Sequence, residues 1–276
     1  MSDEFNSIDG VAYDRDEKIV DGEEIRLYKR MTDGAQWPSV SSIVSHRDTP
    51  EKDEGIQGWR NWLKSQSDRP DPDDVLNYKG WRGTLAHWKA LEPLASYDLA
   101  GDEEQEAYDG LKGWEYRHED ALTRAAGDVD WFLDEFRRMA HEEDIARFDG
   151  DELLEHHVRK VEQYVVETEI GYAGQYDLLY EHPKRGTVLA DLKTSKADSV
   201  DDLIDKKWPD YGMQLAAYAR AARYDIDHVQ VLWASPDTKT AAVIDQDDMP
   251  KTRVEYEEEF VALATELRET LDGYDT

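Results

Sequence analysis

The chain has 276 residues, which is enough for one sizeable domain with its own hydrophobic core. Its 64 Asp and Glu residues outnumber its 33 Lys and Arg residues, giving a formal net charge of −31 at pH 7. A charge of this sign disfavours nucleic-acid binding through a generally basic surface. The sequence contains no cysteine, which excludes disulfides, thiolate metal sites and iron–sulfur clusters.

The hydropathy pattern predicts a protein that does not associate with a membrane. No run of about 18 apolar residues is present, so a transmembrane helix is not expected. The acidic start lacks the basic and apolar regions of a secretory signal, so we expect a cytoplasmic protein. We expect a single domain over residues 1–276, with residues 1–150 as an N-terminal elaboration and residues 151–276 as its core.

The N-terminal residues predict a small β-structure followed by a helix. Residues 11–13 and 25–28 are typical of short strands, and Asp21-Gly22 between them is a hairpin signal. In the segment of residues 37–44, Ser39 is a candidate helix N-cap.

A second helix is predicted over residues 55–66. Its apolar residues Ile56, Trp59, Trp62 and Leu63 recur at helical spacing, which favours packing in the core. Stacking of the tryptophans on nucleic-acid bases is the alternative, and the sequence leaves this choice open.

The middle of the chain predicts a helical layer over residues 102–148, broken in two at Gly127-Asp128. The sequence Glu155-His156-His157 suggests a metal site, but adjacent histidines cannot share one face of a helix. We therefore expect these histidines at the surface.

The second half of the chain predicts strands flanked by helices, as in a mixed α/β fold. A hairpin is predicted from strands near residues 171–180 and 188–194, with Pro183 and Gly186 in its turn. A loop or short helix is expected up to residue 207. Further elements are expected as a helix over residues 211–224, strands over 229–234 and 241–244, and a terminal helix over 254–271.

This hairpin brings three charged residues together. Asp177 lies on one strand, whereas Asp191 and Lys193 lie two apart on the next and point the same way. Two carboxylates can hold a hard divalent cation such as Mg²⁺. Lys193 can then orient or deprotonate an attacking water, or stabilise charge that develops on phosphorus.

Three segments follow one another in the second half of the chain: Gly-Tyr-Ala-Gly-x-x-Asp at residues 171–177, Asp-x-Lys-Thr at 191–194 and Gln-x-x-x-Tyr at 214–218. Their order resembles that of the PD-(D/E)XK nuclease superfamily and, within it, of the RecB-like and phage-type exonuclease branch. The resemblance implies a restriction-endonuclease-like core, a mixed central β-sheet flanked by helices, with a helical N-terminal elaboration. It also implies the catalytic residues Asp177, Asp191, Lys193, Gln214 and Tyr218.

Three further metal ligands follow from the same resemblance. Gly83-x-x-x-His87 is similar to a RecB-like segment whose histidine joins the carboxylates on the metal, and an imidazole ligand favours Mn²⁺ over Mg²⁺. Glu162 matches a glutamate that precedes the Gly-Tyr-Ala-Gly motif, with Glu167 and Glu169 as rivals. The backbone carbonyl of Leu192 is the third ligand that the family implies.

Four other residues are candidate contacts for a nucleic-acid backbone. Thr84 is suited to a phosphate or a helix cap, and Arg82 can pair with a phosphate. Thr194 and Lys196 follow the predicted catalytic strand, and a positive residue near the site in so acidic a chain is a candidate phosphate contact. A surface salt bridge is the alternative for Lys196.

The predicted function is that of a Mg²⁺- or Mn²⁺-dependent deoxyribonuclease in DNA replication, recombination or repair. The resemblance favours an exonuclease, and a recombination or annealing partner protein and a homo-oligomer are possible. The alternatives are a DNA-end-binding recombination accessory with little cleavage and an acidic protein-interaction module.

The acidic composition resembles that of proteins from salt-loving archaea or their viruses. Acidic residues are spread along the whole chain and not gathered in a tail. At molar salt the Debye length is about 3 Å, so an acidic surface would hardly repel DNA from a locally basic cleft. A halophilic origin would therefore reconcile the net charge with a DNA substrate.

Overall fold

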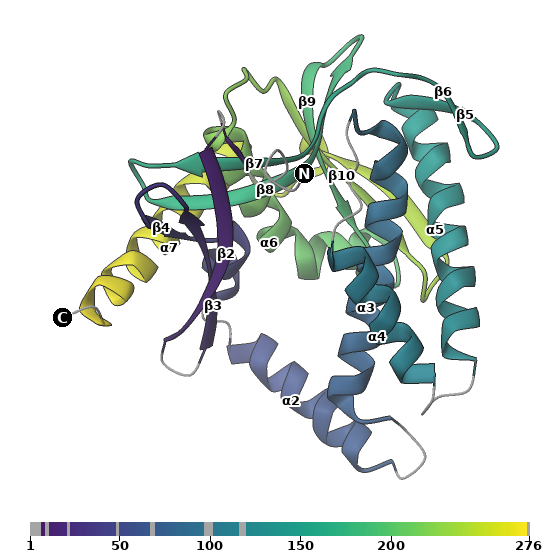
Figure 1. The fold of residues 1–276 in the computed structure, drawn as a ribbon, viewed down its shortest axis with the longest axis horizontal. Helices are drawn as coiled ribbons and strands as arrows, with labels where there is room; N and C mark the ends of the chain where they lie inside the picture. The colour runs from purple at the N-terminus through teal and green to yellow at the C-terminus, as the bar shows by residue number, and fades with distance from the viewer. Residues whose placement is uncertain are drawn as a thin grey trace.

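The structure, a computed structural model, describes residues 7–8, 11–20, 23–47, 50–66, 70–96, 102–115 and 120–274. The fold is mixed α/β, with a central five-stranded sheet, flanking helices and a helical N-terminal region (Figure 1). The predicted α/β architecture is therefore confirmed. Among the described residues, no helix is both long and apolar enough to cross a lipid bilayer.

The central sheet has the strand order β11-β10-β9-β8-β7. Its strands are β7 (Val158–Glu167), β8 (Tyr172–His182), β9 (Gly186–Lys193), β10 (His228–Ser235) and β11 (Thr240–Asp245). Strands β9 and β10 are parallel, whereas the other neighbouring pairs are antiparallel. The predicted hairpin is present as β8 and β9, and Gly186 begins β9 with a left-handed φ of +75°.

Helices cover both faces of this sheet, which explains why β8 and β10 are buried along most of their length. One core contains α1 (Val40–Ser45), α6 (Val200–Ala221) and α7 (Arg253–Tyr274). The opposite core contains α3 (Pro72–Leu91), α4 (Asp102–Glu115) and α5 (Ala121–Glu142). The 3₁₀ helices Glu92–Leu94 (η1) and Gln246–Asp248 (η2) follow α3 and β11.

Helix α6 begins earlier than the sequence predicted. The expected loop ends at Ser199, whose side chain caps the helix by accepting a hydrogen bond from the Asp202 amide. Pro209 lies inside this helix, a position that normally disfavours helical structure. Burial of Leu203 and Trp208 in the first half of α6 outweighs that penalty.

The predicted break at Gly127-Asp128 is wrong, because both residues lie inside α5. A glycine in a helix interior costs only about 1 kcal/mol relative to alanine. That cost is small beside the burial of the apolar stripe Ala125, Val129, Phe132, Phe136 and Met139.

The prediction that the helical layer extends to residue 148 is also wrong. From Ala146 onward the chain forms the antiparallel strands β5 (Ala146–Asp149) and β6 (Glu152–His156). His156 ends β6 and His157 follows it, so neither lies on a helix. Both side chains are exposed, as expected.

The N-terminal sheet consists of β1 (Ser7–Ile8), β2 (Val11–Val20), β3 (Glu23–Arg30) and β4 (Gln36–Pro38). The hairpin of β2 and β3 is confirmed, with longer strands than expected, whereas its turn at residues 21–22 lies outside the described residues. Ser39 caps α1 as predicted, by accepting a hydrogen bond of 3.0 Å from the Ser42 amide.

Helix α2 (Pro50–Lys64) confirms the predicted helix but not its packing. Leu63 is buried, whereas Ile56 is 43% exposed and Trp62 is 52% exposed. Figure 1 shows α2 at the edge of the molecule, away from the central sheet. The expectation that the whole apolar stripe packs in the core is therefore wrong for these two side chains.

Candidate metal centre

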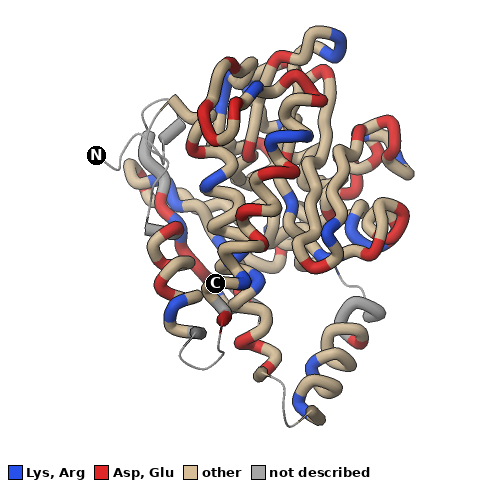
Figure 2. Tube along the Cα trace, turned by 90° about the vertical axis from the view of Figure 1, so that its right-hand side faces the viewer, with Lys and Arg blue, Asp and Glu red and all other residues tan. Residues whose placement is uncertain are grey.

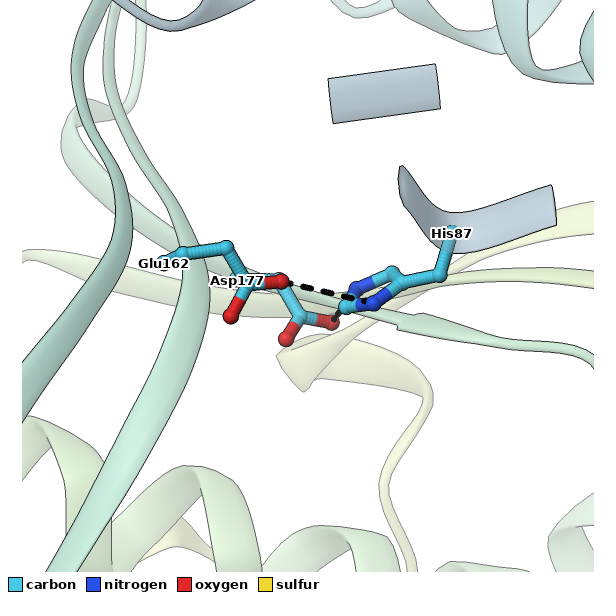
Figure 3. A group of neighbouring side chains, drawn as sticks. All are labelled: His87, Glu162 and Asp177. Carbon is cyan, nitrogen blue, oxygen red and sulfur yellow. Dashed lines mark ion pairs between the residues drawn. The ribbon is translucent and has the colours of Figure 1, made fainter. Parts of the chain in front are cut away.

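Three side chains from separate elements converge at one point: His87 from α3, Glu162 from β7 and Asp177 from β8 (Figure 3). Their ligand atoms all lie within 4.8 Å of one another. The Nδ1 atom of His87 is 3.3 Å from Oε1 of Glu162, and its Nε2 atom is 3.1 Å from Oδ2 of Asp177. Imidazole and the two carboxylates thus point at a shared position.

The register of β7 against β8 places the two carboxylates opposite each other. Val161 pairs with Leu178 and Gln163 pairs with Tyr176, so Glu162 lies across from Asp177. Both carboxylate side chains are at least nine-tenths buried. Since like charges disfavour such proximity, a positive charge beside them, from protonated His87 or a bound cation, stabilises the arrangement.

Glu162 has an uncommon backbone conformation. Its φ is +49°, in the left-handed region that a non-glycine residue rarely occupies. The side chain of Gln175 supports this conformation by donating a hydrogen bond of 3.1 Å to the Glu162 carbonyl. Backbone strain of this kind concentrates at functional sites, where it positions a side chain that regular geometry would direct elsewhere.

Asp191 and Lys193 adjoin the three converging side chains. Oδ2 of Asp177 accepts a hydrogen bond of 2.5 Å from the Leu192 amide, which joins β8 to the strand that carries both residues. Asp191 is buried and forms an ion pair with Lys193, and the Lys193 ammonium lies 5.5 Å from the centre of the Tyr211 ring. The predicted proximity of Asp177, Asp191 and Lys193 is therefore present in the structure.

The protonation states reflect this crowding of charge. Burial opposes the charge on His87, but Asp177 and Glu162 outweigh it and raise the pKa of His87 to about 9. Burial raises the pKa of Asp191, and the neighbouring charge of Asp177 raises it further. Burial also opposes ionisation of Asp177, yet the His87 imidazolium holds the pKa of that carboxyl below its usual value. Without a metal ion, bound protons therefore neutralise part of the negative charge of the cluster.

The donor set suits a divalent cation. Carboxylate oxygens bind Mg²⁺ and Mn²⁺, and a neutral imidazole favours Mn²⁺. Two buried atoms, His87 Nε2 and Asp191 Oδ2, make no hydrogen bond of regular geometry, although each lies against a charged group. The His87 side chain is 26% exposed, although its Nε2 atom is buried.

The comparisons with known proteins give no family for the chain. No protein-family model and no curated protein matches it. Among solved structures it is similar to SSO0001, with a TM-score of 0.30 and 16% identity over 68% of this chain and 83% of that chain. It is also similar to a candidate exonuclease from Eubacterium rectale, with a TM-score of 0.29 and 14% identity over 74% of this chain and 85% of that chain.

Helix α6 contributes the predicted Tyr218 and Gln214. A β-carbon on Gly174 would come within 2.6 Å of the Tyr218 ring, so the glycine is what allows α6 to pack this closely on β8. Burial raises the pKa of Tyr218, and the charge of Asp191 raises it further. Gln214 lies one turn earlier and is partly buried.

Of the three glutamates weighed from the sequence, only Glu162 joins the cluster. Glu167 accepts a hydrogen bond from the Glu169 amide and lies 3.8 Å from Arg220. These two residues belong to the far end of β7 and to the turn that follows it.

The four predicted nucleic-acid contacts lie in different settings. Thr194 is partly buried against Gly83, and Lys196 is exposed beyond β9. Thr84 lies inside α3, so its expected role as a helix cap is wrong. Arg82 is buried and its Nη1 atom pairs with Asp128 and Asp237, so this guanidinium is not a free surface contact.

Sequence reasoning missed Gln175, which supports the strained Glu162 backbone and also accepts a hydrogen bond of 3.0 Å from Arg15 of β2. Its place in the predicted strand, two residues before Asp177, is the signal that could have identified it. Its partners lie on other strands, so the sequence alone did not show the role.

Proposed function

We propose that this protein is a divalent-metal-dependent nuclease that hydrolyses phosphodiester bonds in DNA, most simply as an exonuclease. The observation that supports the proposal is the convergence of His87, Glu162 and Asp177 within 4.8 Å, beside the Asp191–Lys193 pair. Carboxylates and an imidazole can hold a divalent cation, and a lysine beside them can stabilise negative charge on a phosphate, which together suit metal-assisted phosphodiester hydrolysis.

In this proposal, His87, Glu162 and Asp177 hold the cation, and Asp191 completes the ligand set. The Leu192 carbonyl is a further candidate ligand, because the amide of the same residue is already held by Asp177. When bound, Mg²⁺ or Mn²⁺ would supply the positive charge that activates water and neutralises charge developing on the phosphate.

Lys193 would act on the reacting phosphate as a hydrogen-bond donor and cation. Burial opposes its charge, but Asp191 and Asp177 outweigh burial and raise the pKa of Lys193, so the ammonium is the state present near neutral pH. Asp191 and the Tyr211 ring hold this ammonium in place. A fixed cation at this point stabilises negative charge on phosphate oxygens.

Tyr218 and Gln214 would position this machinery from the α6 side. The buried Tyr218 side chain would shield one side of the cluster from water. Thr194, which follows Lys193 directly, would contact the DNA backbone, and Lys196 would do so from its exposed position. A working environment of high salt would screen the −31 charge from DNA.

The test is a nuclease assay in molar KCl with Mn²⁺ or Mg²⁺, on linear and on covalently closed circular DNA. We expect metal-dependent loss of the linear DNA alone. Asp177→Asn and Lys193→Ala should each lower the rate by about 100-fold or more. Matched controls are Asp225→Asn and Lys184→Ala, since both side chains are exposed.

Two outcomes would contradict parts of this proposal. Cleavage of circular DNA at the same rate would show an endonuclease. Absence of cleavage by protein that is folded at that salt would leave DNA-end binding without hydrolysis as the function.

A further inference from the structure

A second polar site lies between α3, α5 and the turn that joins β10 to β11. It is a cavity of about 530 Å³, and its lining residues are Tyr78, Arg82, Arg124, Gly127, Asp128 and Lys239. None of these residues belongs to the candidate metal centre. The cavity therefore calls for an explanation of its own.

Positive charge gathers at this cavity in an otherwise acidic molecule. Arg82, Arg124 and Lys239 line it. Lys79 lies beside them, because it forms an ion pair with Asp237, which also pairs with Arg82. Three of these cations, Lys79, Arg82 and Lys239, contact the two carboxylates of Asp128 and Asp237, so cations outnumber carboxylates within this group. The whole chain has a net charge of −31, and acidic positions recur along most of its trace in Figure 2.

The two carboxylates hold the cations in place. Asp128 accepts from Arg82 Nη1 at 2.7 Å through Oδ2 and from Lys239 Nζ at 2.8 Å through Oδ1. Asp237 accepts from the same Arg82 atom at 3.0 Å and from Lys79 at 2.7 Å. Each carboxylate thus bridges two cations, so the cluster is ordered but keeps an excess of positive charge.

Arg82 is the buried centre of the cluster. Its side chain is only 7% exposed, and its Nε atom is buried without a hydrogen-bond partner. Buried donors are nearly always paired, so a missing acceptor is informative. The guanidinium lies 5.6 Å from the centre of the Tyr78 ring, and the Lys239 ammonium lies 4.8 Å from that of Trp131. Aromatic faces therefore support both cations beside the cavity.

The cavity lies close to the candidate metal centre along the fold. Arg82 precedes His87 by five residues on α3, which is about 7.5 Å along the helix axis. The turn that carries Asp237 and Lys239 follows β10, and the pairing of Trp233 with Lys193 sets the end of β10 beside the end of β9. Both sites thus lie toward the same end of the two parallel strands.

We propose that this cavity binds a phosphate group, at a site distinct from the metal centre. Guanidinium and ammonium groups are the side chains that recognise phosphate oxygens, and preordered cations lose little freedom on binding. The phosphate can belong to a nucleic-acid strand that extends from the metal centre, or to a free phosphate compound. Phosphate binding itself does not depend on the nuclease activity proposed above.

The test uses the full chain in EDTA, at a KCl concentration that keeps it folded. The charge-removing variant is Arg124→Gln combined with Lys239→Gln, since both side chains are exposed or half-exposed and the buried Arg82 stays intact. The matched control is Lys160→Gln combined with Lys184→Gln, which removes the same charge from exposed positions elsewhere. Circular dichroism verifies that every variant is folded.

Two probes distinguish the sources of the phosphate: inorganic phosphate measured by calorimetry, and a fluorescent single-stranded oligonucleotide measured by anisotropy. We expect the cavity variant to weaken phosphate binding by about tenfold or more, with the control unchanged. Equal weakening of oligonucleotide binding would assign the site to a nucleic-acid strand, whereas unchanged oligonucleotide binding would assign it to a free phosphate compound. The proposal is overturned if wild type binds neither probe, or if the cavity variant binds both as the control does. Because these binding measurements are made in EDTA, without a divalent metal ion, their outcome does not depend on the result of the nuclease assay.

Discussion

Gly83 lies so close to Thr194 that a β-carbon at position 83 would come within 2.8 Å of the Thr194 hydroxyl oxygen. His87 is one helical turn further along the same face of α3. We therefore expect the close approach at Gly83 to help set how near the imidazole comes to the carboxylates.

Gly83→Ala should weaken Mn²⁺ binding by about tenfold, because the added methyl group pushes α3 away from the end of β9. Alanine is the better helix former by about 1 kcal/mol, so a loss of affinity would not reflect a weaker helix. The measurement is Mn²⁺ titration followed by electron paramagnetic resonance.

The matched rescue is Gly83→Ala combined with Thr194→Ala. With the hydroxyl removed, the nearest remaining Thr194 atom is the β-carbon at 4.0 Å, an ordinary van der Waals contact. Affinity should return to that of Thr194→Ala alone. If the double variant binds Mn²⁺ as weakly as Gly83→Ala, the contact does not position His87.

The sequence was most informative where chemistry depends on local structure. The β8–β9 hairpin has a short turn, so Asp177, Asp191 and Lys193 could be placed together from strand alternation alone. The motif Gly-x-x-Gly ahead of Asp177 also has a physical reason. Gly171 adopts a φ of +92°, and Gly174 leaves room for the Tyr218 ring.

Features that depend on distant partners could not be predicted. Arg82 pairs with Asp128 and Asp237, which are 46 and 155 residues away in the sequence. The residues next to Arg82 in the sequence give no sign of these partners, so the sequence suggested only a phosphate contact for it. The left-handed conformation of Glu162 has no local signal, because glutamate is not a residue that favours it.

Metal affinity should rise with pH. Burial opposes the charge on His87, yet Asp177 and Glu162 raise its pKa to about 9, above the ordinary histidine value of about 6.5. A metal ion needs the neutral imidazole, so below about pH 9 binding must displace a proton and weakens by up to tenfold per pH unit. Between pH 6.5 and 8.5 we expect Mn²⁺ affinity to rise by up to about 100-fold.

The raised pKa of His87 also predicts that the stability of the metal-free protein falls as the pH rises. Because the folded pKa of His87 exceeds its unfolded value, the stability from its ion pairs is fully present below about pH 6.5. That stability is lost as the pH rises through about 9. Chemical denaturation in EDTA at several pH values measures this trend, and His87→Asn should remove it; an equally steep loss in that variant would exclude His87 as the cause.

Metal binding should stabilise the fold. At an ion concentration 100 times the dissociation constant, linkage adds about 2.7 kcal/mol to the free energy of unfolding. We therefore expect Mn²⁺ to raise the melting temperature of wild type, and EDTA to reverse the rise. Glu162→Gln should abolish the effect, whereas Glu155→Gln, on the exposed strand β6, should retain it. A rise of equal size in both variants would place the ion elsewhere.

Structure should be lost as salt is removed. The chain carries a net charge of −31, and its Asp and Glu residues are spread along the sequence. The Debye length grows from about 3 Å at 1 M salt to about 30 Å at 0.01 M, so repulsion among these carboxylates acts over the whole molecule at low salt. Circular dichroism from 2 M KCl down to 0.01 M should show progressive loss of helical signal. Choline chloride at the same ionic strength is the control, since screening alone would retain the signal. A spectrum unchanged down to the lowest salt would mean that the acidic surface is tolerated without screening, and the composition would no longer support a high-salt environment.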